Sequence, residues 1–217
     1  MPRVPAQQRR ESLIQAAINV IAEYGVNGAT TRRIAAAARA PLASLHYAFH
    51  SKEELFFAIQ EEQVRLLDER DLQVSPEVGL GATAAEILRL VMEWWTDQTD
   101  FARATIELMI WAHRHDRSLA IRSYDVGLTS IIKDLREAKT ADDGDELIEA
   151  LARMIAAAAD GLALQWLTYR DRDRLAKDVE LFGESMERLV AEHRGSNGTN
   201  NQTRSVEARG STARVRE

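Results

Sequence analysis

The stretch from Thr30 to Leu55 concentrates side chains that are suited to contact with nucleic acid. Hydroxyl and ammonium groups can donate hydrogen bonds to phosphate oxygens, which positions a protein on a duplex without specifying a base sequence. The residues that we expect to bind phosphates are Thr31, Ser44, Tyr47 and Lys52. Polar and charged side chains are odd choices for burial, so a plain helical hairpin inside a core is the weaker interpretation of this stretch.

Other side chains in the same stretch suit contact with base edges. Arg32 or Arg33 can hydrogen bond to a guanine through both ends of its guanidinium group. Leu42 and Ala43 can touch the methyl group of a thymine. His46 can reach either a base or a phosphate. The stretch therefore predicts both positioning and sequence-specific contacts to DNA.

The spacing of apolar residues predicts the helices that must position these groups. We expect helices at about residues 6–24, from Thr30 or Thr31 to about residue 38, and at 42–47, and a fourth that opens at Ser51 and runs to about residue 70. A threonine at the start of the second helix can cap it by accepting a hydrogen bond from a backbone N–H of the first turn. Gly25 is placed to end the first helix, and Ser51-Lys52-Glu53-Glu54 is a capping box. Two short helices joined by a tight break form a helix-turn-helix, whose second helix can enter the major groove end-on.

The distribution of charge agrees with this interpretation, although the net charge of −6 does not. Residues 1–52 contain seven Lys and Arg against two Glu, a net of +5, which leaves −11 for the remainder of the chain. One basic end attracts a polyanion and the acidic remainder repels it.

The same stretch resembles the TetR family of repressors. The matching landmarks are Thr30-Thr31, Ile34-Ala35, Ala43-Ser44-Leu45-His46-Tyr47-Ala48-Phe49 and Ser51-Lys52-Glu53-Glu54-Leu55. The resemblance covers roughly residues 10–60, and the rest of the chain agrees in helix number and order. It implies a homodimeric, cytoplasmic repressor that binds a double-stranded DNA operator and is released by a small-molecule effector. In the family, the positions that match Tyr47 and Lys52 contact phosphates.

Three residues depart from the family pattern. Arg39 stands where the turn usually has Gly, and a positive φ there would cost an Arg about 1 kcal/mol or more. Pro41 replaces the usual Ser cap, and His46 replaces the usual first Tyr. These departures leave the expected fold intact and put the family's operator sequence in question.

The remainder of the chain also has helical periodicity, and no stretch shows sustained alternation of a strand. We therefore expect an all-α protein of about nine helices. Residues 1–52 form a three-helix helix-turn-helix domain with the start of helix four, residues 53–194 a helical ligand-binding and dimerisation domain, and residues 195–217 a disordered tail that is nearly free of large apolar residues.

Four Trp residues in the second domain indicate either dense packing or a ligand cavity lined by aromatic rings. We expect a small hydrophobic or aromatic effector to contact Trp95, Met109, Trp111, Tyr124, Gln165 and Trp166. A DNA-binding regulator with a closed core and no effector is the alternative that the sequence leaves open.

The last two helices carry apolar residues on more than one face, so one face requires a partner. A second copy of the chain is the simplest partner, and the resemblance implies a four-helix dimer interface. The segments Trp111–Asp116 and Asp160–Leu167 are loosely similar to the betaine-regulator-like branch of the family.

Several classes of site and protein are not expected from the sequence. The chain has no Cys, and His113 and His115 point to different sides of a helix, so no metal or other cofactor is expected. No nucleophile–base pair or Gly-rich phosphate loop indicates an enzyme. No apolar run approaches the roughly 20 residues of a membrane span, and the N-terminus lacks the apolar core of a signal peptide.

Overall fold

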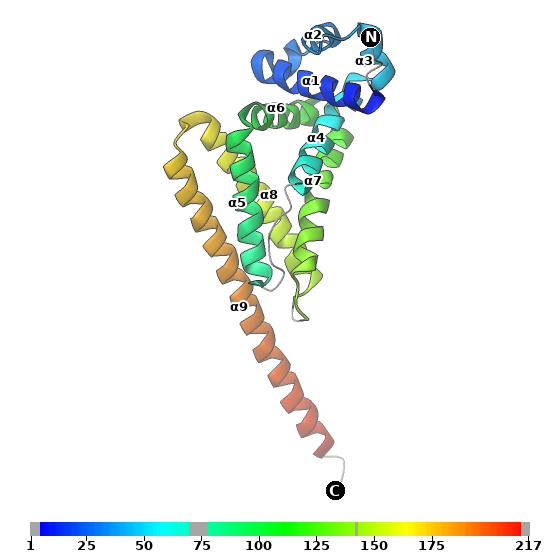
Figure 1. Cartoon of the computed structure of the whole chain (residues 1–217). Coiled ribbons are helices and arrows are strands. Elements are labelled where there is room, and N and C mark those ends of the chain that lie inside the picture. The colour runs from blue at the N-terminus through cyan, green and yellow to red at the C-terminus, as the bar shows by residue number, and fades with distance from the viewer. Residues whose placement is uncertain (1–4, 70–77, 142, 214–217) are drawn as a thin grey trace.

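The computed structural model describes residues 5–69, 78–141 and 143–213, with side chains to Gly195. In this part of the chain the regular secondary structure is α-helical, in nine helices (Figure 1). They are α1 (Ala6–Gly28), α2 (Thr31–Ala37), α3 (Leu42–Ala48), α4 (Lys52–Asp68), α5 (Leu80–Asp97), α6 (Thr99–His115), α7 (Arg117–Glu137), α8 (Asp145–Tyr169) and α9 (Arg172–Ala213). The all-α prediction is confirmed.

The local signals that define the first three helices act as the sequence predicts. Gly25 has φ 71° and ψ 168°, which breaks the helical path of α1. The side chain of Thr30 caps α2 by accepting a hydrogen bond from the backbone N–H of Arg33. Arg39 has φ 50°, so the turn between α2 and α3 does hold a non-glycine residue in the left-handed region. Pro41 begins α3 without a side-chain cap.

The capping box of α4 differs from the expected form in one bond. The Ser51 hydroxyl accepts from the backbone N–H of Glu54, at 3.0 Å, as predicted. The Glu54 carboxylate accepts from the backbone N–H of His50, at 2.7 Å, instead of from that of Ser51. This bond lowers the pKa of Glu54, and it fixes the end of the chain that leaves α3.

Helices α4, α5, α7, α8 and α9 form the body below the N-terminal helices, and α6 crosses between the two parts (Figure 1). α5 packs against α8 and α9, and α7 packs against α4 and α8. α6 contacts α1 as well as α4, α5, α7 and α8. Its position makes α6 the main structural link from the body to α1.

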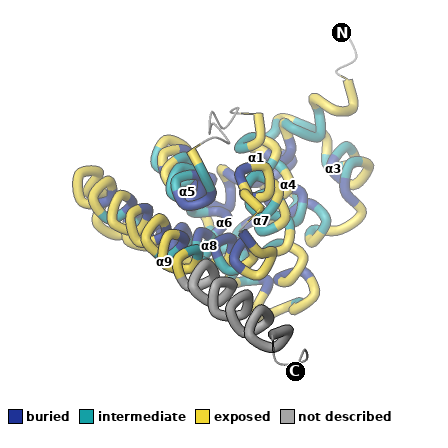
Figure 2. Tube along the Cα trace, turned by 90° about the horizontal axis from the view of Figure 1, so that it is seen from below, coloured by how far each residue is buried: buried dark blue, intermediate teal, exposed yellow. Residues whose placement is uncertain are grey.

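The buried core is continuous from α1 to α9. α4 places Leu55 and Ile59 in the same core as Leu13 and Ile18 of α1, so α4 is shared between the two parts. α5 and α9 come especially close at Gly183, where an added Cβ would lie 2.9 Å from the Cβ of Ala85. Figure 2 shows that buried residues of α9 follow one side of the helix, the side that packs on the body. The two domains predicted from the sequence, which meet near residue 52, share one hydrophobic core. The boundary between them therefore separates two expected functions and not two separate cores.

The last described side chains of α9 are anchored by an ion pair. Arg194 donates to both oxygens of the buried Asp143, at 2.9 and 2.8 Å, and holds the pKa of that carboxyl near 2. Beyond Gly195 the backbone is helical to Ala213, whereas the sequence analysis expects a disordered tail from residue 195. Helical hydrogen bonds are local, so a helix can propagate past the segment that packs.

None of the helices in the described ranges combines the length and hydropathy that a membrane crossing requires.

Candidate DNA-binding surface and inner cavity

α2 and α3 lie at the end of the molecule that is farthest from the C-terminus (Figure 1). α3 buries Leu45, which is only 2% exposed, and turns its polar side outward. Ala43, His46 and Tyr47 are exposed, and the Tyr47 ring is 87% exposed. The structure therefore presents the predicted recognition helix as an accessible surface.

The two arginines of α2 have different environments. The guanidinium of Arg33 donates to the carbonyl oxygen of Gly28, at 2.7 Å, and lies 4.3 Å from the centre of the Tyr24 ring. Arg32 is exposed and makes no side-chain hydrogen bond or ion pair within the described residues. Arg32 is thus the arginine that is available to a base, whereas Arg33 stabilises the end of α1.

Lys52 is half-buried and is also turned toward the protein. Its Nζ donates to the carbonyl oxygen of Val26, at 3.1 Å, and lies 4.9 Å from the centre of the Phe56 ring. Burial lowers the pKa of Lys52. Thr31, Leu42 and Ser44 are partly buried, so they offer less surface than Arg32 or Tyr47.

A cavity of about 120 Å³ lies within the body, between α4, α5, α6, α7 and α8; we call it the inner cavity. Most of its wall is apolar. The residues that line it are Gln60, Gln63, Val64, Leu67, Asp68, Ile87, Leu90, Val91, Trp95, Thr105, Met109, Ser123, Tyr124, Gly127, Leu128, Ser130, Ile131, Asp134, Ala156, Ala159 and Asp160. Ligand sites of proteins have this character, an apolar wall with a few polar groups.

Three of the six predicted effector contacts line the inner cavity: Trp95, Met109 and Tyr124. The other three, Trp111, Gln165 and Trp166, do not line it. Trp111 stacks on His115, with ring centres 4.6 Å apart, and meets Phe56 edge-on. The physical reason is helical phase, because residues at different angles on one helix face different neighbours.

The same reason applies to the two predicted residues of α8. This helix turns Ala156, Ala159 and Asp160 toward the cavity. Gln165 is exposed and accepts a hydrogen bond from Arg174, at 3.3 Å. The buried ring of Trp166 lies under the guanidinium of Arg170.

The carboxyl groups of the cavity were not predicted from the sequence. The Tyr124 hydroxyl donates to Asp160, and Ser130 donates to Asp68, at 2.8 Å. Burial raises the pKa of Asp160 and raises that of Tyr124 to about 12. Burial, together with the nearby charge of Asp68, raises the pKa of Asp134 to about 6. One signal was present in the sequence, since Asp160 is the one carboxyl within the apolar stretch of residues 150–169.

Trp95 brings an unsatisfied donor to the wall of the cavity. The residue is 3% exposed, and its indole N–H has no hydrogen-bond partner. Unpaired buried donors are rare in native proteins because each forfeits the hydrogen bonds it would make in water. Trp166 has an unpaired N–H as well, but it does not line the cavity, whereas Trp95 does.

α6 contacts both the cavity and the N-terminal helices. Thr105 and Met109 line the cavity, and the Thr105 hydroxyl donates to Gln63, at 2.7 Å. From the same helix, Arg103 donates to the carbonyl oxygen of Ala22, at 3.1 Å, and Glu107 accepts from the backbone N–H of Val26, at 3.0 Å.

These two hydrogen bonds hold α6 to α1 on either side of the break at Gly25. The carbonyl of Val26 is the same group that Lys52 of α4 binds. If a ligand shifted α6, the C-terminal end of α1 would therefore move with it. This end of α1 leads directly into α2.

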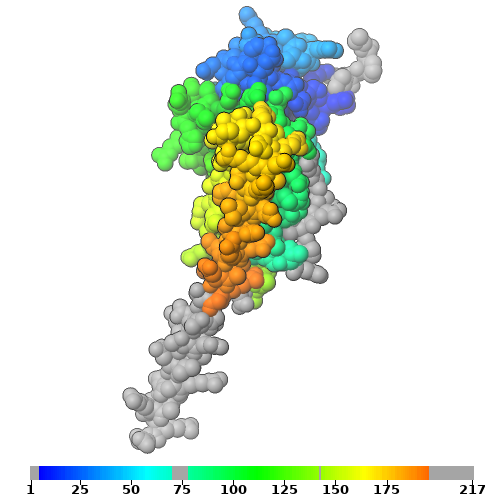
Figure 3. Space-filling view, turned by 90° about the vertical axis from the view of Figure 1, so that its left-hand side faces the viewer, coloured from blue at the N-terminus to red at the C-terminus, as the bar shows by residue number. Residues whose placement is uncertain are grey.

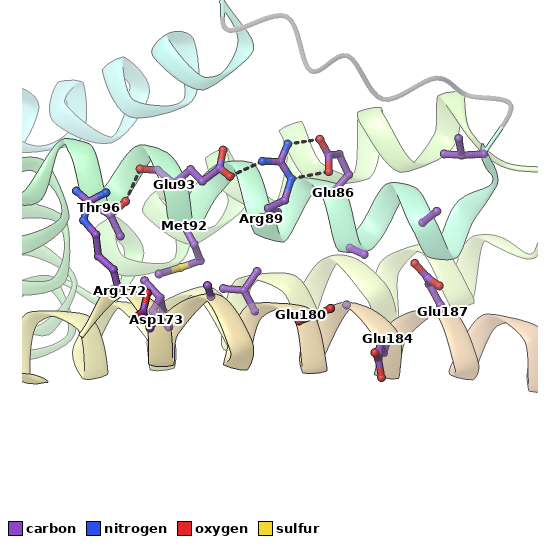
Figure 4. Close-up of a pocket in the computed structure, with 17 residues that line it drawn as sticks. Glu86, Arg89, Met92, Glu93, Thr96, Arg172, Asp173, Glu180, Glu184 and Glu187 are labelled. Atoms are coloured by element: carbon purple, nitrogen blue, oxygen red, sulfur yellow. Dashed lines mark hydrogen bonds and ion pairs between the residues drawn. The ribbon is translucent and has the colours of Figure 1, made fainter. Parts of the chain in front are cut away.

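A larger hollow of about 990 Å³, the outer groove, runs between α5 and α9 (Figure 4). Its walls are strongly charged, and Arg89 is paired with both Glu86 and Glu93. The groove is open along its length, and its polar groups already have partners or face solvent. Despite its greater size, it is a poorer ligand site than the inner cavity, which holds an unpaired donor.

Among the described residues, no group of three or more His, Cys, Asp and Glu side chains is arranged to hold a metal ion.

Comparison with known proteins extends the similarity beyond the first helices. Residues 13–59 match the family model of bacterial regulatory proteins of the tetR family. Over 172 residues, which are 76% of this chain and 86% of the relative, the chain is 31% identical to the HTH-type nicotine-responsive transcriptional repressor HdnoR of Paenarthrobacter nicotinovorans.

Two solved structures give the same result. A structure of the multidrug binding protein EbrR complexed with ethidium superposes with a TM-score of 0.60 at 26% identity, and covers 86% of this chain and 99% of that chain. A member of the TetR family from Streptomyces coelicolor A3 superposes with a TM-score of 0.61 at 27% identity, and covers 84% of this chain and 98% of that chain. The similarity thus includes the helical body that holds the inner cavity.

Proposed function

Because this chain belongs to the TetR family of bacterial transcriptional regulators, we propose that it is a homodimeric repressor released from its operator by a small molecule in the inner cavity. The observation that carries this proposal is the cavity wall itself. It combines the unpaired N–H of Trp95 with residues of α6, the helix that also holds α1.

We propose that the DNA-binding surface comprises the exposed residues of α2 and α3 together with their neighbours. The residues are Thr31, Arg32, Leu42, Ala43, Ser44, His46 and Tyr47. Arg33 and Lys52 stabilise this surface by donating hydrogen bonds to the carbonyl oxygens of Gly28 and Val26, respectively, at the end of α1. A lysine has three donors, so Lys52 keeps others for a phosphate.

We propose that the dimer forms through α8 and α9, as the apolar residues left on their outer faces suggest. Figure 3 shows α9 and the end of α8 on one face of the molecule. The large apolar side chains exposed on these helices are Leu164, Tyr169, Leu181 and Phe182. Ala157 and Gly161 are small and exposed on α8, which allows a partner helix to approach closely. A two-fold dimer of this kind can place two recognition helices roughly 34–36 Å apart, one turn of DNA.

The bonds from α6 to α1 supply a route for release. A ligand shifts an equilibrium only if it binds one conformation more tightly than the other. We propose that the effector favours a position of α6 in which the bonds of Arg103 and Glu107 to α1 hold the recognition helices at a spacing unsuited to the operator. A hundredfold preference would shift the equilibrium by about 2.7 kcal/mol.

The names of the relatives support an effector, because one is nicotine-responsive and another was solved with ethidium. The presence of a cavity favours this function over a regulator with a closed core. We propose no catalytic activity, and we place the protein in the cytoplasm, with the DNA that it regulates. The similarity to the betaine-regulator-like branch remains a prediction.

The experiment begins with an operator selected from random DNA by the full-length dimer, whose mass is checked by sedimentation. Compounds are then screened for release of that operator at fixed salt. Ala159→Leu fills the inner cavity, and we expect it to retain DNA binding but to lose the response to every releasing compound. Ala141→Leu, an exposed position, is the control. If Ala159→Leu folds and still responds fully, the effector does not bind in the inner cavity.

A further inference from the structure

The charged residues of the inner cavity all have the same sign. Asp68 comes from α4, Asp134 from α7 and Asp160 from α8. No Lys, Arg or His is among the residues that line the cavity. Within the described part of the chain, none of the three carboxyl groups forms an ion pair with a basic side chain. Three helices thus direct negative charge at one largely apolar space.

The surroundings of these groups do not neutralise them. Asp160 accepts a hydrogen bond from Tyr124 and otherwise lies beside Ala156 and Ala159 in the cavity wall. Asp134 lies near Asp68 and Glu137, and only Lys133, its neighbour in the chain, opposes their charge. Asp68 is exposed, but Asp134 and Asp160 are partly buried, and partial burial of an unpaired charge is unfavourable unless a counter-ion arrives. A cationic ligand would supply that counter-ion.

The other walls define the remainder of such a ligand. The cavity wall requires that the body of the ligand be apolar, because it includes Leu67, Ile87, Val91 and Leu128. The rings of Trp95 and Tyr124 attract a cation over their faces. The indole N–H of Trp95 is a donor only and has no partner, so it requires an acceptor on the ligand.

We infer that the effector is a small organic cation: an amine or quaternary ammonium group, carried on an apolar or aromatic body that also bears a hydrogen-bond acceptor. This inference rests on the proposed effector function of the inner cavity. The carboxyl groups of Asp134 and Asp160 bind the positive charge, and the Trp95 N–H binds the acceptor. Anionic ligands of the same shape are repelled.

The test uses three aryl methyl ethers that differ mainly in charge: (4-methoxybenzyl)trimethylammonium, its uncharged carbon analogue 1-methoxy-4-neopentylbenzene, and 4-methoxyphenylacetate. Binding to the full-length dimer is followed by the fluorescence of the four Trp residues, and operator release is measured separately. We expect the cation to bind at least tenfold more tightly than the neutral ether, and the anion to bind most weakly.

Variants assign the preference to the carboxyl groups. Asp134→Asn with Asp160→Asn keeps the shape of the wall and is expected to abolish the tenfold preference while leaving the affinity for the neutral ether unchanged. Asp125→Asn, at an exposed position of the same α7, is the matched control. Thermal melts of all variants confirm that they fold.

The outcomes separate the two proposals. Equal binding of the three compounds, or no binding of any of them, overturns the inference of a cationic effector. If the neutral ether or the anion binds as tightly as the cation and releases the operator, the effector function stands and the inference of charge falls. If the cation binds selectively without releasing the operator, the charge preference stands and the effector function falls.

Discussion

The DNA-binding surface and the inner cavity differ in how they present polar groups to a partner. The surface displays Arg32, His46 and Tyr47 to solvent on two short helices that are close in sequence. The cavity contains the buried Trp95 N–H and the partly buried Asp134 and Asp160, among residues from five helices. Exposed polar groups are satisfied by water while they wait for a partner, whereas buried ones are not. The cavity is therefore the region where the free protein holds unfavourable energy that a ligand can relieve.

The largest expected effect belongs to the surface. We predict that Arg32→Ala with Tyr47→Ala lowers operator affinity by about 100-fold or more, because each lost base or phosphate contact costs about 1–3 kcal/mol. Fluorescence anisotropy at fixed salt measures the affinity. Arg136→Ala, which removes the same charge from the exposed end of α7, is expected to have no more than a twofold effect. Wild-type affinity in the folded double variant would show that DNA binds another face.

The second prediction concerns the link between the two regions. Glu107→Met removes the acceptor of the buried Val26 N–H, and we expect it to lower the free energy of unfolding by about 1–3 kcal/mol. Urea unfolding at a fixed protein concentration measures this change. We also expect effector binding to persist while operator release weakens. Glu107→Gln retains an acceptor oxygen and is expected to restore both properties; failure of this rescue would contradict a role for the bond.

The third prediction concerns Trp95. Trp95→Phe removes the unpaired N–H while keeping an aromatic ring, so the variant is expected to be about as stable as the wild type, although a smaller ring leaves some empty space. The affinity for the methoxy cation should fall about tenfold or less, the usual range for one hydrogen bond. The affinity for benzyltrimethylammonium, which lacks the acceptor, should change far less. Equal losses for both cations would show that the ring, and not its N–H, makes the contact.

The smallest effect is the pH dependence of stability at Asp134. Its pKa is raised from 3.8 to about 6 in the folded protein, so the folded state binds this proton more tightly than the unfolded state. The resulting stability is present below about pH 4 and is lost as pH rises through 6. We therefore expect Asp134→Asn to raise the Tm by about 2 °C at pH 8, a value discounted for partial exposure.

At pH 4.5 the same variant should melt close to the wild type. Asp125→Asn, which removes the same charge at an exposed position of α7, is the matched control. A stabilisation by Asp134→Asn that is equal at both pH values would mean that the effect does not come from titration of this carboxyl. Together with the loss of cation binding, the expected result would show that the cavity trades stability for function.

The ends of the first helices were easier to predict from the sequence than the residues of the inner cavity. The caps at Thr30 and Ser51 and the break at Gly25 were foreseen, because each depends on residues within one turn. A positive φ at Arg39 was considered only as a condition, and the structure has it. The exposure of Tyr47 was also foreseen. The inward bonds of Arg33 and Lys52 were not, because the carbonyls that hold them belong to the distorted end of α1.

The cavity was predicted only in part. Trp95, Met109 and Tyr124 line it, but Trp111, Gln165 and Trp166 do not. Residue type indicated that aromatic groups gather in the body, but it did not indicate how each helix is rotated about its axis. That rotation is set by packing against several neighbours at once, and it also decided that Asp68, Asp134 and Asp160 face the same space.

The sequence by itself determined the helical class, the helix-turn-helix with its caps and breaks, and the positive charge of the first 52 residues. Hydrogen bonds and periodicities within a few residues are enough to specify these features. Only the tertiary structure decided which arginine of α2 remains free, which aromatic residues meet in the cavity, and that α6 contacts both the cavity and α1. The cavity and the link through α6 depend on contacts between residues that are tens of positions apart in the chain, such as the bond between Val26 and Glu107, and local patterns carry no information about them. The bond of Arg33 to Gly28 spans only five residues, but it depends on the distorted end of α1.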